Sequence, residues 1–144
     1  MNEIEKAAIR ELRNYNGYKI KITNLKEKIK ALDEIYGSGI SYDDDVRVDS
    51  GFKNSAENNM ITRIDKKEEL ERILKITKAN ISIIERALEN LSEEERRVLT
   101  AFYIDRIYSP ADKMAAHLNI SRTNTYNIRD AALKRFVIMV SGII

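Results

Sequence analysis

Apolar residues recur at steps of three and four along two long stretches of the chain, residues 2–36 and about 61–90. This period places the apolar side chains on one face of a helix, and the regular alternation of four and three is the heptad pattern of a coiled coil. Two such helices joined by a loop most simply fold back on each other. We therefore predict an N-terminal antiparallel coiled-coil helical hairpin. The residues expected to be buried between its helices are Leu25, Ile29, Leu32, Ile73, Leu74 and Ile81.

The segment between these two helices, residues 37–59, has the composition of a loop. It contains three glycines, four serines and four aspartates, which are residue types that favour turns. Loops of this length are uncommon in compact domains and are usually functional or mobile. We predict a long acidic loop over 37–59, inside a helical arm that spans residues 1–90. The aspartates lack the glycine and glutamate spacing of an EF-hand, so we expect no metal site.

Helix-capping residues predict shorter helices in the remainder of the chain, residues 91–144. Ser92 and Glu95 have the spacing of a capping box, which places a helix start at Ser92. Pro110 is the only proline, and proline is favoured at the first helical position. Ser109 is then the expected N-cap. We treat residues 91–144 as a second domain made of short helices.

The last two predicted helices have the spacing of a helix-turn-helix. Asn119 tolerates the left-handed backbone of a tight turn, and Ser121 caps the final helix. Ala115 supplies the small residue where the helices cross, whereas Thr125 stands where valine or isoleucine would bury better. The apolar residues around the turn are Met114, Leu118, Ile120 and Ile128. We predict a helix-turn-helix DNA-binding domain over 91–144, and the alternative is an ordinary helical hairpin.

The exposed face of the final helix carries side chains that suit DNA. Arginine pairs with guanine, asparagine pairs with adenine, and threonine or tyrosine binds phosphate. From Ser109 onward there are five basic and two acidic residues, a local charge of +3 against +2 for the whole chain. A plain solvated face is the alternative, but it would more often carry Glu and Lys. The candidate DNA-binding residues are Ser121, Arg122, Thr123, Asn124, Tyr126, Asn127 and Lys134.

The composition argues against several other functions. Without cysteine there is no thiol nucleophile and no thiolate metal site, and His117 is the only histidine. No glycine-rich phosphate loop is present, so we expect no enzyme activity and no cofactor. The longest apolar run, "FVIMV", is too short to cross a bilayer. We therefore expect a cytoplasmic protein without a membrane partner.

The uncharged segment "FVIMVSGII" at the end of the sequence is expected to be buried, with Val137, Val140 and Ile144 packed on the arm or on a second subunit. The same surplus of apolar surface suggests a homodimer. Two paired DNA-binding helices would also bind more tightly than one, through avidity.

Two quoted segments carry a resemblance to known proteins. "LSEEERRVLTAFY" followed by "SPADKMAAHLNISRTNTYNIRDAALKRF" resembles region 4 of sigma-70-type factors over residues 91–137. The shared pattern is "RxVL" after an acidic run, a helix ending "xAxxLxIS", and a second helix ending "AL+xF/L". With the helical arm, the chain resembles phage late-gene transcription regulators of the RinA and ArpU type. Departures are Asn119, where glycine is frequent, and Thr125, where an aliphatic residue is usual.

The resemblance implies a sequence-specific transcription regulator of phage or prophage origin. Its implied partners are double-stranded DNA and RNA polymerase, and the implied DNA-reading positions are Arg122, Thr123, Asn124, Tyr126 and Asn127. One alternative is a phage small terminase subunit, which joins similar parts in the opposite order. Another is an adaptor that binds only proteins. A ring of many subunits would favour the terminase, and a monomer or dimer the regulator.

Overall fold

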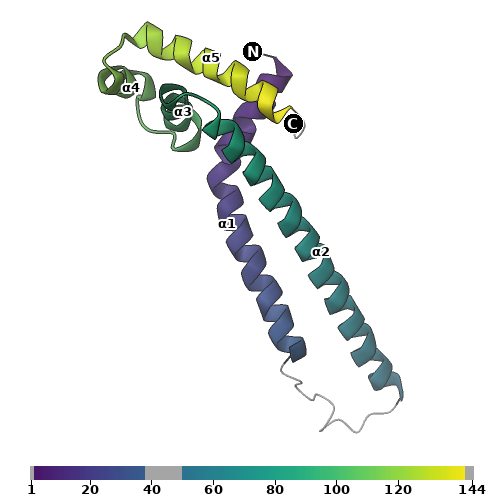
Figure 1. Cartoon of the computed structure of the whole chain (residues 1–144). Helices are drawn as coiled ribbons and strands as arrows, with labels where there is room; N and C mark the ends of the chain where they lie inside the picture. Colours follow the sequence, from purple (N-terminus) through teal and green to yellow (C-terminus); the bar gives the residue numbers. More distant parts are fainter. Residues whose placement is uncertain (1, 38–49, 142–144) are drawn as a thin grey trace. The chain divides into compact units, whose positions relative to one another are not determined.

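The computed structural model describes residues 2–37 and 50–141, with side chains over 2–35 and 60–141. Over these residues the chain forms only helices and turns, so the predicted all-α class is confirmed. None of the helices in this part of the chain has an apolar stretch able to span a bilayer. The elements are α1 (Glu3–Gly37), α2 (Ser50–Glu89), α3 (Glu93–Leu99), the π-helical turn η1 (Thr100–Ile104), α4 (Pro110–Leu118) and α5 (Arg122–Val140) (Figure 1).

The chain divides into two compact units. The first comprises Met1–Lys19 and Ala79–Ile144, and the second comprises Ile20–Lys78. This division differs from the predicted boundary between residues 90 and 91. The reason is that the start of α1 and the end of α2 share an apolar core with the C-terminal helices. The two long helices therefore each contribute to both units.

The core of the first unit joins residues that lie far apart in the sequence. Leu12 from α1 and Phe136 from α5 are both fully shielded from solvent, and each such burial stabilises the fold by roughly 1.5–3 kcal/mol. The start of α1 thus belongs to the unit that holds α5. The buried members are Ala8, Ile9, Leu12, Ile84, Ala87, Leu88, Leu91, Leu99, Tyr103, Ala132, Leu133, Phe136 and Val140.

A second, smaller apolar cluster holds α4 in place. Val98 of α3, Ala101 of η1 and Met114 of α4 are buried together, and Leu118 and Ile128 pack against them. The cluster therefore joins four elements, because Ile128 belongs to α5. These contacts hold α4 against α3, η1 and α5.

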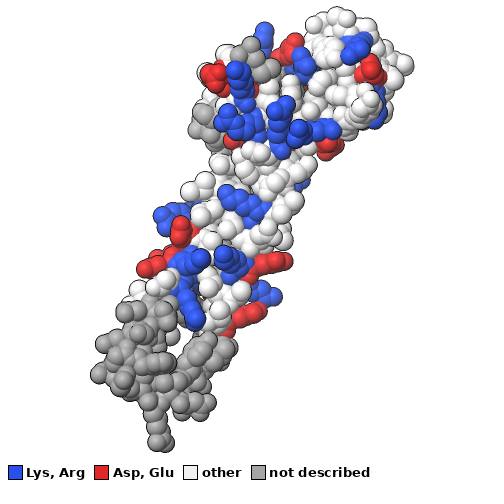
Figure 2. Space-filling model, turned by 180° about the vertical axis from the view of Figure 1, so that it is seen from behind, with Lys and Arg blue, Asp and Glu red and all other residues white. Residues whose placement is uncertain are grey.

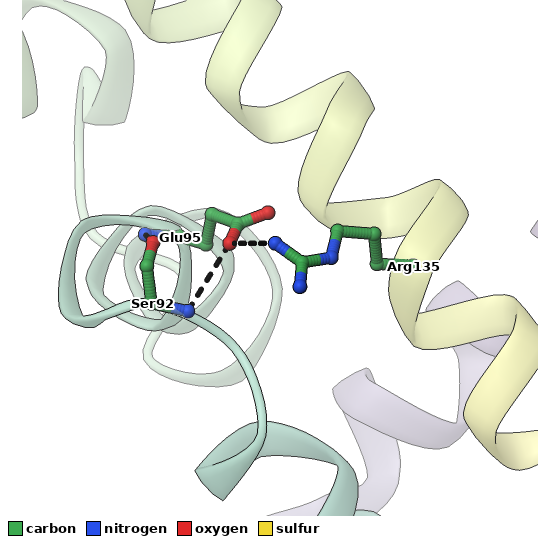
Figure 3. Close-up of polar contacts among 3 residues, drawn as sticks. All are labelled: Ser92, Glu95 and Arg135. Atoms are coloured by element: carbon green, nitrogen blue, oxygen red, sulfur yellow. Dashed lines mark hydrogen bonds and ion pairs between the residues drawn. The ribbon is translucent and has the colours of Figure 1, made fainter.

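The predicted capping box at the start of α3 is confirmed. The backbone N–H of Glu95 donates to Ser92 Oγ at 3.2 Å, and the N–H of Ser92 donates to Glu95 Oε1 at 3.1 Å (Figure 3). Arg135 of α5 donates from Nη1 to the same Oε1 at 2.8 Å. Glu95 is 9% exposed, so one buried carboxylate caps α3 and also ties it to α5.

We expect Glu95→Ala to lower the free energy of unfolding by about 1–2 kcal/mol, because the variant loses both the cap and the bond from Arg135. Glu95→Gln keeps an acceptor for the Ser92 N–H and should lose less. Denaturant titration followed by circular dichroism measures both values. Equal losses for the two variants would show that the acceptor oxygen is not what matters.

The six residues predicted to be buried between the two long helices are only partly buried as a group. Ile81 is buried at 7% exposure and lies in the first unit. The other five residues are half-buried, so the prediction of full burial is wrong for Leu25, Ile29, Leu32, Ile73 and Leu74. Over 20–35 and 60–78 these side chains belong to two helices alone, and a helix pair without a third layer leaves such side chains partly exposed.

The predicted loop over 37–59 is wrong at its C-terminal end. Residues 50–59 form the first turns of α2, and residues 38–49 lie outside the described part of the chain. Lys53, Ala56 and Glu57 favour helix. Extending an existing helix costs much less than starting one, so α2 incorporates Ser50, Gly51 and Ser55, which are of the residue types that had indicated a loop.

The apolar C-terminal segment is buried on one side only. Val140 is fully buried and Val137 is partly buried, but Ile138 is 76% exposed. The prediction that the whole segment is buried is therefore wrong at Ile138, and Ile144 lies outside the described residues. Consecutive residues of a helix point in different directions, so a single core cannot cover them all.

Candidate nucleic-acid interface

The turn between α4 and α5 has the geometry expected from its sequence. Asn119 adopts the left-handed conformation, with φ 58° and ψ 44°. The N–H of Ile120 donates to the carbonyl of Ala115 at 3.0 Å, which closes the end of α4. Ser121 is extended, and its Oγ accepts the N–H of Asn124 at 3.0 Å. Both predicted roles are confirmed, and they set where α5 begins.

Thr125, which stands where valine or isoleucine was expected to bury better, is completely buried. Its hydroxyl donates to the carbonyl of Ser121 at 3.1 Å, so the buried oxygen has a partner. A buried hydroxyl without a hydrogen bond would be costly, and this local bond removes that cost. Threonine therefore fits the site almost as an aliphatic residue would.

Six of the seven candidate DNA-binding residues are exposed, and Tyr126 is half-buried. Thr123, Asn127 and Lys134 follow one another at steps of four and seven, so they share one face of α5. Thr125 and Phe136 occupy the buried face of the same helix. The first two turns of α5 thus present hydroxyl, amide and guanidinium groups to solvent. The exposed residues are Ser121, Arg122, Thr123, Asn124, Asn127 and Lys134.

Tyr126 joins α5 to η1 through a cluster of rings and cations. Its ring lies edge-on to Phe102, with centroids 6.0 Å apart. The Arg129 guanidinium lies 4.9 Å from the Tyr126 centroid and 5.2 Å from that of Phe102. These contacts keep the tyrosine ring on the flank of α5. Its hydroxyl accepts a bond from Arg122 Nη2 at 3.3 Å and can still donate its own proton to another acceptor.

Arg122 is held at the start of α5 by two partners. Beside the bond to Tyr126, its Nε lies 3.5 Å from Asp112 Oδ1 of α4. The pKa of the Arg122 guanidinium is raised above its ordinary value, first by the hydrogen bond with Tyr126 and then by the charge of Asp112. The ion pair is exposed and stabilises the fold little. Its effect is to orient a cation that remains accessible to solvent.

A groove of about 450 Å³ lies outside the predicted site, between α3, η1 and α4. Its floor is apolar and its rim is basic. Arg97 donates to Glu93 at 2.8 Å and to His117 Nε2 at 3.2 Å, because a guanidinium can only donate. Such a rim can bind phosphate or carboxylate oxygens. The lining residues are Arg96, Arg97, Thr100, Ala101, Asp105, Ile107, Lys113, Met114 and His117.

Both signs of charge occur on the face drawn in Figure 2. Lys and Arg side chains lie close to Asp and Glu side chains there, and several Lys and Arg side chains adjoin one another. Any attraction to an anionic partner therefore depends on particular side chains, not on a uniform field. Among the residues with a described position, no group of three or more His, Asp or Glu is arranged to hold a metal ion.

The fold and the site define a small all-α protein whose last helix begins with an exposed, polar and partly basic surface. Residues 37–136 match the family described as "Protein of unknown function (DUF1492)", and the chain belongs to this family. The match includes α2, α3, η1, α4 and most of α5, up to the buried Phe136. No curated protein and no solved structure matches the chain.

Proposed function

We propose that this protein is a sequence-specific DNA-binding transcription regulator of phage or prophage origin. In this proposal α4 and α5 form a helix-turn-helix like that of sigma region 4. The observation that carries the proposal is the division of α5 into two faces. Thr125 and Phe136 are fully buried, while polar side chains suited to DNA fill the exposed start of the helix.

The proposed complex places the first two turns of α5 in the major groove. Arg122 then pairs with guanine and Asn127 with adenine, and both side chains are exposed. Ser121, Thr123 and Tyr126 would donate hydroxyl hydrogens to phosphates. In this complex Asn124 would lie at the edge of the DNA major groove. Lys134 comes two turns after Asn127, so it reaches at most a phosphate.

The basic rim of the groove beside α4 would support the same docking. In helix-turn-helix proteins the first helix crosses the DNA backbone. Lys113 and His117 lie on the exposed side of α4, next to Arg97 of α3. These groups would face phosphates on the flank of the site, where they add affinity without sequence preference.

The proposed role of α1 and α2 is an antiparallel helical arm that contacts RNA polymerase or a second copy of the protein. Two observations support the pairing. Lys67 of α2 forms an ion pair with Asp33 of α1, and five of the six residues predicted to lie between the two helices are half-buried. The arm would connect DNA bound by α5 to its protein partner.

We expect Arg122→Ala and Asn127→Ala each to weaken binding to the preferred duplex by about 1–3 kcal/mol and to relax preference at one or two base positions. Lys134→Ala should weaken binding to all duplexes about equally. It should also make the slope of log affinity against log salt concentration shallower by about 1. Lys66→Ala, an exposed lysine of the second unit, is the matched control and should change nothing. The preferred duplex is first selected from a random pool with the purified protein.

The measurement is the dissociation constant for the selected and a scrambled duplex at two salt concentrations. If selection enriches no sequence, or if the Arg122 and Asn127 variants bind both duplexes as the parent does, the regulator proposal fails and the adaptor gains support. The size of the protein in solution adds a second check. A ring of many subunits would favour the terminase alternative.

A further inference from the structure

An acidic residue stands beside the proposed base contact. Asp112 lies in the first turn of α4, is 60% exposed at its side chain, and pairs with Arg122 across the turn. A carboxylate near DNA repels phosphates, so by charge alone Asp112 weakens binding to every duplex. Because Asp112 pairs with Arg122, its effect on that arginine could outweigh this repulsion.

Asp112 and Tyr126 contact different nitrogen atoms of the Arg122 guanidinium. Asp112 lies at Nε and Tyr126 at Nη2, and neither contact uses Nη1. The Tyr126 ring is itself held by Phe102 and Arg129. An unrestrained arginine must give up much rotamer freedom before it can make two hydrogen bonds to a base. A guanidinium that is already oriented loses less.

We infer that Asp112 is a positioning residue, which sets the preference for guanine at the base read by Arg122 without itself touching DNA. This inference rests on the proposed function. Tyr126 supplies the second support, from the flank of α5. Removing either support should leave Arg122 able to bind DNA but less able to distinguish guanine from the other bases.

The chain offers a matched control in Asp130. This residue is exposed to a similar degree, 56% at its side chain against 60% for Asp112, and it pairs with Arg129 instead of Arg122. Asp112→Asn and Asp130→Asn each remove one negative charge from the same unit. A purely electrostatic role predicts that both variants tighten binding to all duplexes alike. A positioning role predicts that they differ.

The experiment measures dissociation constants for two duplexes, the selected sequence and one with the Arg122-dependent guanine replaced. That guanine is the position at which Arg122→Ala loses preference. The preference is the dissociation constant for the replaced duplex divided by that for the selected duplex. We expect Asp112→Asn to lower this ratio by about three- to tenfold, which is a part of what one bidentate base contact provides. Tyr126→Phe should lower the ratio less. Asp112→Glu should restore most of it, and Asp130→Asn should leave it unchanged.

The outcomes separate this inference from the function on which it rests. If the parent prefers its selected duplex and Asp112→Asn keeps the same ratio, the inference is overturned and the regulator proposal stands. The same holds if Asp112→Asn and Asp130→Asn behave identically. If the parent binds both duplexes equally, both ideas fail together. Thermal melting of each variant establishes that a changed ratio comes from a folded protein.

Discussion

Replacing Phe136 by alanine is expected to lower the free energy of unfolding by about 3–5 kcal/mol. Its ring is completely buried in the first unit, among residues from α1, α2, α3, η1 and α5. Alanine would leave a cavity in a core to which five elements contribute, and close-packed neighbours relax only partly into such a space. Denaturant titration followed by helical circular dichroism gives the value directly.

Ile138→Ala is the control for this measurement, because Ile138 lies on the same helix and is 76% exposed. Its effect should stay within about 0.5 kcal/mol of zero, as for other surface substitutions. Similar losses for the two variants would mean that α5 does not bury the face on which Phe136 lies. The assignment of the exposed face would then fall as well.

Leu12→Ala is expected to cost about 2–5 kcal/mol, the second largest effect. Leu12 is fully buried with residues of α2 and α5, although it lies near the start of α1. The loss would therefore appear as destabilisation of the unit that contains α5. Denaturant titration followed by circular dichroism measures the loss of free energy of unfolding.

Ile20→Ala tests whether the effect of Leu12 reflects burial or merely the loss of an apolar side chain. Ile20 is on the same helix and is 62% exposed, so its replacement should change the free energy of unfolding by less than about 0.5 kcal/mol. If Leu12→Ala were equally mild, α1 would not be part of the core that supports α5.

Features set by neighbouring residues were predictable from the sequence. The capping box at Ser92, the turn at Asn119 and the cap at Ser121 each depend on one or two residues and on hydrogen bonds within five positions. Such motifs keep their meaning whatever surrounds them. The start of α5, and with it the set of exposed candidate residues, followed from the same local signals.

Features set by contacts between distant residues were not predictable. Nothing in the sequence pairs Glu95 with Arg135 or places Arg129 over Phe102, because these meetings depend on how α3, η1 and α5 pack. The groove beside α4 has the same origin. In the sequence alone, Arg96 and Arg97 had no separate role and His117 stood out only as the single histidine, whereas the fold brings all three to one groove.

The core shared by α1 and α5 also has a consequence for synthesis of the chain. Ala8, Ile9 and Leu12 are synthesised long before Phe136 and Val140, which complete their core. At roughly 5–20 residues per second, the delay is on the order of ten seconds. During that interval the apolar face at the start of α1 lacks the part of the core that α5 supplies. Contacts of such long sequence separation slow folding, so this unit is expected to fold later than the second unit.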